Sequence, residues 1–455
     1  MMRSLRRLFS LLLCLALLLS TSALALAEDL PYLLPVQVGG GSFQVRAYSD
    51  GYLNNLFLSL ADLSTALSGT EKQFALGFAY TPTDGDMFLL TSGQPSAGPS
   101  SSGVNDWKRV SSLYLFRNRL FLDNRELKYY TYRSGTDLYM SLTDIQLMLD
   151  FTIEPSEGGG LRLYPERPFR PDVEALEKEG YFGGFNAVLL GDADTGEILY
   201  LHQGTKALPI ASLSKLMSYL LIAESVKSGQ LGLDTMVPVT QEALDLSLSA
   251  DGIIDMTGVA AVSVSELLDA MLLASSNESA LALAQYLAGS ESAFVEAMSR
   301  RAKELGLSSA EFHTVNGLPW YTPGTTPAKL QNCMSAFDLF KLCRHLLAFH
   351  PELTARTAQA FGNMPTLNYM TANSNALVFN LPGVNGLKTG NTNRAGYCLI
   401  SSLPVTAGGA THTVVLVVLG AETPAVRNQA SHMLLKYARN YYAEHGFSPS
   451  VEPVP

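Results

Sequence analysis

Several residue types that would indicate particular classes of protein are scarce in this chain of 455 residues. It has four cysteines, and one of them, Cys14, lies in the N-terminal leader described below. The other three, Cys333, Cys343 and Cys398, have neither the number nor the spacing of a disulfide framework or a zinc motif, so we interpret them as small buried apolar residues. The seven histidines are scattered along the chain. We therefore expect no metal and no cofactor.

Basic residues are outnumbered, with 31 Lys and Arg against 41 Asp and Glu. This acidic balance argues against binding to nucleic acid or to an anionic membrane surface. Charged residues make up 16% of the chain and hydrophobic residues 47%, which excludes a disordered protein. The length predicts two or three folded domains.

Long apolar runs are absent after the N-terminus. There, three arginines among residues 3–7 precede the apolar run Leu8–Leu19 and the small residues Ala25–Ala27. This order predicts a cleaved secretory signal peptide and an extracytoplasmic protein. An uncleaved membrane anchor is the alternative, but the run is short for a membrane span. Cleavage leaves 28 basic against 41 acidic residues, a net charge of about −13.

The region after the leader contains an internal repeat. Asn55–Leu63 matches Asp137–Ile145 at a constant offset of 82, and each copy follows a hairpin-like stretch and leads into a predicted short helix. A Ser/Gly/Pro-rich loop is predicted at Thr91–Asn105. The pattern resembles the small β-rich module at the N-terminus of copper amine oxidases. The repeats lack histidine, so the resemblance does not imply copper.

A proline-rich connector follows, with prolines at positions 165, 168 and 171. The predicted organisation is a signal peptide (1–27), a β-rich two-repeat module (28–165), a linker (166–172), a second domain (173–443) and a flexible tail (444–455).

The second domain contains a serine one helical turn before a lysine, in the sequence Ser212-Leu213-Ser214-Lys215 at the start of an apolar helix. Residues at i and i+3 share a helix face, and the first turn of a helix favours negative charge beside Ser212. A serine hydroxyl needs a base to act as a nucleophile near neutral pH, and a lysine is a base only if its pKa is lowered. The pair therefore predicts an activated nucleophile, although Ser-x-x-Lys alone also arises by chance.

Two further motifs follow in order: Ser275-Ser276-Asn277, then Lys388-Thr389-Gly390. The order S-x-x-K, S-x-N, K-T-G is the signature of penicillin-binding proteins and serine β-lactamases. The region Val173–Tyr442 resembles one family in particular, the low-molecular-weight D-alanyl-D-alanine carboxypeptidases. The segments that carry this resemblance are PIASLSKLM, LLDAMLLASSNESALALA, RAKELGLSSAEFHTVNGL, SAFDLFKLCRHLL and VNGLKTGNTNRAGYCLISS.

This resemblance implies an α/β fold of the penicillin-binding and β-lactamase type, in which a central antiparallel sheet has helices on both faces and a helical part is inserted. It also implies a serine carboxypeptidase, associated with the cell wall, that removes the terminal D-Ala from peptidoglycan stem peptides and is acylated by β-lactams. The sequence pattern predicts a hairpin at 185–202, helices at 240–246, 264–272, 278–287, 293–305, 336–349 and 425–442, and strands at 386–390, 397–402 and 414–420.

The resemblance also assigns roles to the motif residues. Ser212 is the nucleophile, Lys215 its base, Ser275 a proton relay to the leaving amine, and Asn277 a partner of the substrate amide. Lys388 would lower the pKa of Lys215 and attract the terminal carboxylate. The resemblance further implies that the Thr389 hydroxyl contacts the substrate carboxylate and that Gly390, the last residue of the motif, lies in the substrate-binding strand. The backbone N–H groups of Ser212 and Asn391 would form the oxyanion site.

Some residues depart from the family pattern. Glu278 stands where aspartate is usual, and no arginine for a terminal carboxylate is found at 368–385, so endopeptidase activity stays an alternative. A β-lactamase is disfavoured because Met364 replaces the glutamate of a Glu-x-x-Leu-Asn loop. A catalytically silent wall-binding protein is disfavoured because every motif is intact. His313 is expected to be structural. Release, or retention at the wall through the N-terminal module, is expected rather than membrane docking by the tail.

Overall fold

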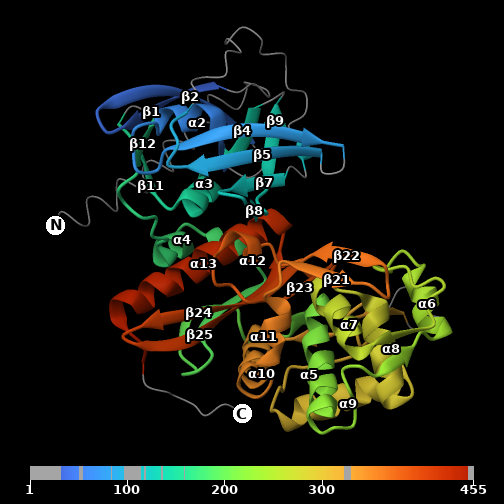
Figure 1. Cartoon of the computed structure of the whole chain (residues 1–455). Helices are drawn as coiled ribbons and strands as arrows, with labels where there is room; N and C mark the ends of the chain where they lie inside the picture. Colours follow the sequence, from blue (N-terminus) through green and yellow to red (C-terminus); the bar gives the residue numbers. More distant parts are fainter. Residues whose placement is uncertain are drawn as a thin grey trace. The chain divides into compact units, whose positions relative to one another are not determined.

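A computed structural model of the chain describes residues 32–50, 55–82, 85–96, 114–116, 119–134, 137–157, 159–321 and 329–448 (Figure 1). The predicted signal peptide, residues 97–105 of the predicted loop and residues 449–455 of the predicted tail lie outside these ranges. The chain divides into two compact units, residues 1–170 and 171–455. The division falls within the range 166–172 that the prolines indicate as a linker.

The described residues of the first unit form two sheets with two short helices, α2 (Leu60–Ala66) and α3 (Leu142–Leu149). The larger sheet has the order β11 (Thr152–Pro155), β12 (Leu161–Tyr164), β1 (Tyr32–Val38), β2 (Gly41–Asp50), β3 (Asn55–Ser59), β10 (Asp137–Ser141), β9 (Thr131–Ser134), β6 (Tyr114–Phe116). The smaller sheet has the order β4 (Phe74–Thr81), β5 (Gly85–Ser92), β7 (Arg119–Leu122), β8 (Arg125–Leu127). Apolar residues from both sheets and both helices form one core.

The sequence repeat appears in this unit as a symmetric strand pair. In the antiparallel pairing of β3 with β10, Ser59 lies opposite Tyr139 and Phe57 lies opposite Ser141. Because the repeat offset is 82, these two pairs are equivalent by the repeat. Ser59 and Ser141 also cap the helices that follow, each accepting a hydrogen bond from a backbone N–H three residues later. The expected short helices are confirmed.

The second unit is built on a five-stranded antiparallel sheet whose strands come from both ends of the unit. Its order is β14 (Ile198–His202), β13 (Ala187–Asp192), β25 (Ala410–Ala421), β24 (Gly396–Ala407), β23 (Leu387–Thr392). Helix α13 (Pro424–His445) packs against one face, and α10 (Ala336–Phe349) packs against the other.

Strand β25 shows why this sheet carries helices on both faces. Val414, Leu416 and Val418 belong to the apolar core that includes α13, whereas the alternate residues, such as Val415 and Val417, belong to the core that includes α10. Successive strand residues point to opposite faces, so an unbroken apolar run requires cover on both. The predicted architecture is confirmed.

A mostly helical part is inserted between β14 and β23 (Figure 1). Its main elements are η3 (Ala211–Ser214), α5 (Lys215–Lys227), α6 (Gln241–Ser247), α7 (Val264–Asp269), η4 (Ala270–Ala274), α8 (Asn277–Ala288), α9 (Glu291–Glu304), α10 and α11 (Glu352–Thr357). The smaller elements of the unit are α4 (Val173–Lys178), η2 (Tyr181–Gly184), α12 (Leu377–Asn380) and the ribbons β15 (Leu208–Pro209) with β20 (Cys333–Met334), β16 (Met236–Pro238) with β17 (Ala261–Ser263), β18 (Trp320–Tyr321) with β19 (Lys329–Leu330), and β21 (Phe361–Met364) with β22 (Tyr369–Ala372).

Three local features differ from the sequence-based expectations. The helix predicted to reach residue 272 ends as an α-helix at Asp269 and continues as the π-turn η4. The first residues of the predicted flexible tail are packed, because α13 extends to His445 and the Phe447 ring stacks on His412. The third concerns the cysteines: all three described residues have free thiols, but Cys333 is only half-buried.

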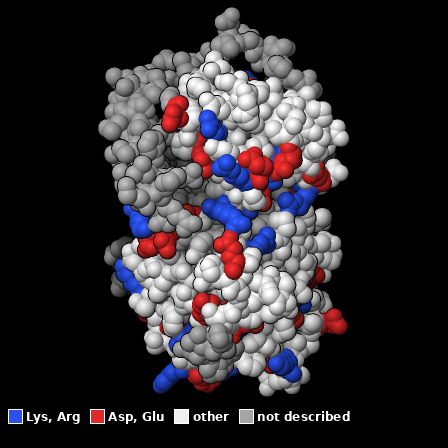
Figure 2. Space-filling view, turned by 90° about the vertical axis from the view of Figure 1, so that its left-hand side faces the viewer, with Lys and Arg blue, Asp and Glu red and all other residues white. Residues whose placement is uncertain are grey.

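Among the described residues, no helix combines the length and the apolar character that a membrane crossing requires. On the face shown in Figure 2, the described Lys and Arg side chains lie beside Asp and Glu side chains and form no large patch of one sign.

Candidate active site

The predicted nucleophile lies on a tight turn. Residues Ala211–Ser214 form the 3-10 helix η3, and α5 begins at Lys215. A 3-10 helix has three residues per turn, so side chains at i and i+3 are eclipsed. The Lys215 Nζ and Ser212 Oγ atoms are accordingly 2.8 Å apart.

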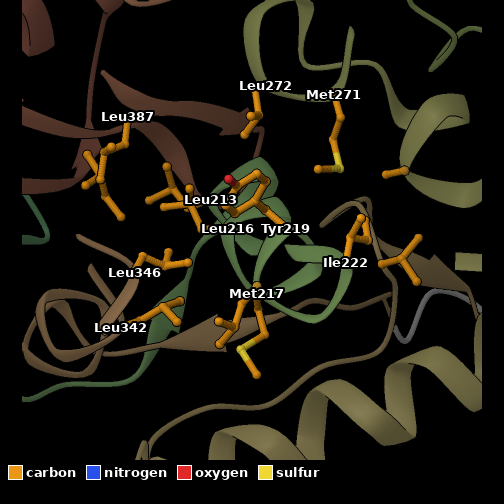
Figure 3. Close-up of a cluster of buried hydrophobic side chains, with 14 of the residues drawn as sticks. Leu213, Leu216, Met217, Tyr219, Ile222, Met271, Leu272, Leu342, Leu346 and Leu387 are labelled. Carbon is orange, nitrogen blue, oxygen red and sulfur yellow. The ribbon is translucent and has the colours of Figure 1, made fainter. Parts of the chain in front are cut away.

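Apolar packing fixes this turn. Figure 3 shows that side chains from the start of α5 point toward side chains of other elements in a buried cluster. The labelled members are Leu213, Leu216, Met217, Tyr219 and Ile222 near the start of α5, Met271 and Leu272 of η4, Leu342 and Leu346 of α10, and Leu387 of β23. Burying one leucine side chain contributes roughly 1.5–3 kcal/mol. The cluster therefore stabilises the position of the serine–lysine pair.

The amino group of Lys215 is fully buried and lies among polar partners. Besides Ser212, its Nζ atom lies 2.7 Å from Asn277 Oδ1, 3.1 Å from the Asn316 carbonyl oxygen and 3.4 Å from Ser275 Oγ. The structure thus brings together all four residues that the sequence predicts as catalytic. The Asn316 carbonyl is a further partner that the motifs do not indicate.

Burial lowers the pKa of Lys215 well below its usual value, and repulsion from Lys388 lowers it further, while Glu278 acts in the opposite direction. The sequence predicts the repulsion from Lys388, but loss of hydration is the larger cause. A lowered pKa is what allows a lysine to accept a proton near neutral pH.

The second motif reaches Lys215 because the chain turns sharply after η4. Ser275 adopts a left-handed backbone conformation with φ of 66°, and α8 begins at Asn277. The Asn277 amide group binds in two directions, since Oδ1 faces Lys215 and Nδ2 donates to the Asp251 carbonyl at 2.7 Å. This amide is therefore held firmly beside the lysine.

The third motif lies on β23, the edge strand of the sheet, which packs against η3. Lys388 is buried, and its Nζ atom donates to the Thr389 carbonyl at 2.9 Å. Burial and the nearby Arg427 lower the pKa of Lys388 to about 7. The Thr389 hydroxyl donates to Ser374 Oγ at 2.7 Å, and Asn391 is exposed.

Gly390 allows the edge strand to approach the nucleophile. A Cβ atom at this position would lie 2.9 Å from the Ser212 backbone nitrogen and 3.1 Å from that of Leu213. The Ser212 N–H belongs to the first turn of η3, where a helix has no partners of its own for its N–H donors, whereas the Leu213 N–H donates to the Ile210 carbonyl at 3.1 Å. A side chain at position 390 would therefore fill the space in front of the expected oxyanion site.

A second glycine, in the loop after α9, packs against the same turn. Gly317 has φ of 85°, and a Cβ atom there would lie 2.0 Å from the Ala211 carbonyl oxygen. The neighbouring Asn316 supplies the carbonyl oxygen that faces Lys215. Nothing in the sequence shows that Asn316 and Gly317 lie beneath the nucleophile.

We expect Gly317→Ala to lower both the rate of acylation and the melting temperature. The added methyl group strains the backbone and pushes the Ala211–Ser212 peptide out of place, so the loss of acylation should be at least about tenfold, on the scale of a 1 Å misplacement. Gly289→Ala is the matched control, because Gly289 has a similar φ of 80° but no atom within 4 Å of an added Cβ. Equal rates for the two variants would contradict the packing role of Gly317.

Known proteins that resemble this chain point to the same chemistry as the geometry. The profile of the D-alanyl-D-alanine carboxypeptidase family matches residues 185–423, slightly more than half of the chain. The chain belongs to this family. The resemblance seen in the motifs is confirmed.

Three similar proteins illustrate the range of the family. D-alanyl-D-alanine carboxypeptidase DacF of Bacillus subtilis is 30% identical over 262 residues, which cover 57% of this chain and 63% of that protein. The D-alanyl-D-alanine endopeptidase of Pseudomonas aeruginosa is 30% identical over 220 residues, covering 47% and 65%. The crystal structure of PBP3 from Streptococcus pneumoniae, titled a peptidoglycan synthesis regulatory factor, is 28% identical with a TM-score of 0.52 and covers 56% and 72%. The first two matches span less than two thirds of those relatives' own length.

Glu278, which stands where the family usually has aspartate, is buried and holds two neighbouring segments together. Its buried carboxylate accepts hydrogen bonds from the Ile254 backbone N–H at 2.6 Å and from the Ser276 hydroxyl at 2.8 Å. The longer side chain thus joins the Ser275–Asn277 loop to the segment before it. His313 pairs with Glu311 at 2.8 Å, consistent with a structural role.

Met364 lies at the position where a β-lactamase would need a glutamate to activate the deacylating water. Met364 ends β21 and is fully buried, and residues 365–368 form the turn that leads to β22. A buried thioether at this position cannot activate a water molecule for deacylation.

Proposed function

We propose that this chain is a serine D-alanyl-D-alanine carboxypeptidase that removes the terminal D-Ala from peptidoglycan pentapeptides and is acylated by penicillin. The observation that carries the proposal is the buried Lys215 amino group 2.8 Å from Ser212 Oγ, in a chain of the carboxypeptidase family. The distance lies within the range for direct proton transfer between a nucleophile and its base.

Acylation then follows from the positions of the four polar groups. The Ser212 oxygen forms a bond to the carbonyl carbon of the penultimate D-Ala while its proton passes to Lys215 Nζ. The bond from that carbon to the nitrogen of the terminal D-Ala breaks, and the departing nitrogen takes up a proton. Ser275, whose Oγ atom lies 3.4 Å from Lys215 Nζ, is placed to relay it.

The negative charge on the substrate oxygen develops beside the first turn of η3. The Ser212 N–H, together with that of Asn391, is the proposed pair of donors, and loss of one such donor typically costs about 3–4 kcal/mol of transition-state stabilisation. Water then attacks the acyl carbon, the bond from that carbon to Ser212 Oγ breaks, and the proton that the water loses returns to Ser212 Oγ through Lys215 Nζ. The free enzyme and a tetrapeptide result.

Recognition of the terminal carboxylate is assigned to the edge strand. Lys388 supplies a positive charge, and Thr389 supplies a hydroxyl that is held by Ser374. Lysine suits this task as a point charge rather than as a hydrogen-bonding fork. The proposal does not depend on an arginine between residues 368 and 385, where the sequence has none.

The testing experiment incubates the mature protein with a pentapeptide ending in D-Ala-D-Ala and measures released D-alanine. A fluorescent penicillin added in parallel reports the acyl-enzyme. Release of D-alanine with stable labelling is the expected result. Cleavage of cross-linked dimers without release from the pentapeptide would identify an endopeptidase, rapid turnover of the penicillin would identify a β-lactamase, and neither labelling nor release would leave a wall-binding protein.

We further propose that the protein acts outside the cytoplasm and that its first unit contacts the cell wall. The signal-like leader supports this location. Contact by the β-rich module is inferred from its resemblance to modules attached to exported wall enzymes, with a simple spacer as the alternative.

A chain that begins at Pro171 should keep its kcat/KM for a soluble pentapeptide. All motif residues lie in the second unit, and the apolar cores of the two units contain no common residue. The same shortened chain should lose retention on insoluble peptidoglycan, as measured by sedimentation beside the mature protein. If a folded shortened chain, checked by circular dichroism, loses activity on the soluble peptide, the first unit contributes to catalysis and the spacer interpretation is wrong.

A further inference from the structure

A second polar cluster lies in the catalytic unit where α5 and α10 end. Glu224, in the last turns of α5, lies near His345 of α10 and near His350, the residue that follows α10. These residues line a cavity of about 340 Å³, and its other lining residues are Lys227, Ser228, Arg301 and Phe349. The proposed mechanism uses none of them.

The three side chains form the kind of ligand set that zinc prefers. One ligand atom from each of Glu224, His345 and His350 lies within 4.8 Å of the other two. A tetrahedral zinc ion with bonds of about 2.0–2.1 Å holds its ligand atoms about 3.4 Å apart, so side-chain movements on the order of 1 Å are enough to close the site. The adjoining cavity leaves room for water as a fourth ligand.

We propose that Glu224, His345 and His350 bind a zinc ion, or a transition-metal ion of the same preference, at a site separate from the Ser212 centre. Two imidazoles with one carboxylate suit zinc, whereas calcium and magnesium prefer oxygen ligands alone. The set was not evident in the sequence because Glu224 lies more than a hundred residues before the histidines, and His345 and His350 are five residues apart.

Neighbouring groups orient two of the three ligands. The His350 Nδ1 atom lies 3.3 Å from the Glu352 carboxylate, so Nε2 is the nitrogen that can bind the metal. A carboxylate behind a histidine ligand is a recurrent feature of zinc sites. On Glu224, Arg301 donates two hydrogen bonds to Oε1, at 2.9 and 2.7 Å, so we assign Oε2 as the oxygen that binds the metal.

Burial distinguishes this cluster from an exposed group of charges. His345 is 8% exposed and His350 is 2% exposed, so both imidazoles are largely shielded from water. The two positive side chains at the cavity, Lys227 and Arg301, make an anion the competing occupant. Lys227, however, donates to the Phe349 carbonyl at 3.1 Å, and Arg301 is bound to Glu224, so both cations already have partners.

A metal at this position would join the end of α5 to the end of α10. Glu224 is nine residues after Lys215 on the same helix, about 14 Å along its axis. The ion would therefore stabilise the helix that carries the lysine without touching substrate. Binding to the folded state alone raises the melting temperature in proportion to the logarithm of metal concentration over Kd.

The experiment uses the mature protein without an affinity tag, treated with a chelator and dialysed. Isothermal titration with Zn²⁺ should give one ion per chain with a micromolar or tighter Kd, and the melting temperature should rise. Cobalt(II) should give visible absorption bands of a low-symmetry site with nitrogen ligands. Penicillin labelling should be unchanged within about twofold.

Three variants make the test specific. Glu224→Gln keeps the size of the side chain and an oxygen for Arg301, and should weaken zinc binding at least tenfold while remaining folded. His350→Ala should abolish binding. His313→Ala is the matched control, because His313 also pairs with a glutamate but forms no such ligand cluster with the residues that the structure describes. It should bind zinc like the unchanged protein.

Several outcomes would overturn the proposal. They are absence of zinc binding, binding that survives in both Glu224→Gln and His350→Ala, and a rise in melting temperature with inorganic phosphate but not with zinc. The last result would identify an anion site. Because penicillin labelling is measured separately, failure of the metal site is distinguishable from failure of the proposed peptidase activity.

Discussion

Ser212→Ala should abolish covalent labelling by penicillin and lower the rate of D-alanine release by about 10⁴-fold or more. Ser212 supplies the only hydroxyl that combines a place in the first turn of η3 with a distance of 2.8 Å from Lys215 Nζ among the described residues. The change removes one partly exposed hydroxyl group and leaves the buried apolar residues of the turn, such as Leu213, intact. The fold should therefore persist, with a melting temperature close to that of the unchanged protein.

The matched control is Ser214→Ala, two residues along the same turn. The Ser214 hydroxyl is buried and donates to the Ala211 carbonyl at 2.7 Å, so its loss should cost about 1 kcal/mol of stability. Labelling should persist in this variant. If instead Ser212→Ala is still labelled, a different residue is the nucleophile, and the site described above is not the centre of acyl transfer.

The sequence indicated the nucleophile and its base through a short-range pattern, because the spacing of Ser212 and Lys215 is local. The sheet with helices on both faces was implied by the resemblance to the carboxypeptidase family, and the apolar run of β25 agrees with it. The helix at Ala336–Phe349 begins and ends at the predicted residues because Ser335 caps it and its apolar residues recur at helical spacing.

The features that the sequence did not indicate depend on contacts between distant segments. Asn316 and Gly317 come more than a hundred residues after Ser212, and nothing in their own neighbourhood shows that they lie under it. The π-turn before Ser275 is equally invisible in the sequence, since Ala270–Ala274 has good helical propensity, and the turn is widened where the Ser275 N–H donates to the Ala270 carbonyl five residues earlier. The cluster at Glu224 joins two distant segments, the ends of α5 and α10, in the same way.

Lys215→Arg should be nearly inactive, with acylation lowered by about 10²–10⁴-fold, although it keeps a positive charge. Arginine keeps its proton above pH 12 and cannot accept the proton of Ser212. In the unchanged protein, kcat/KM should rise with pH as Lys215 loses its proton, and this rise should lie well below pH 10.5 because burial and Lys388 lower the pKa of Lys215. The variant should show no such rise, and pH profiles of D-alanine release measure the difference.

Lys215→Met separates the roles of charge and base. Methionine is similar in length and carries no charge, so it should be as inactive as arginine if proton acceptance is the essential step. If the positive charge alone is essential, arginine should remain within about tenfold of the unchanged protein while methionine loses activity. That second pattern would exclude Lys215 as the base. Because the Lys215 amino group is also held by Asn277 and the Asn316 carbonyl, melting temperatures of both variants are needed to show that the site remains folded.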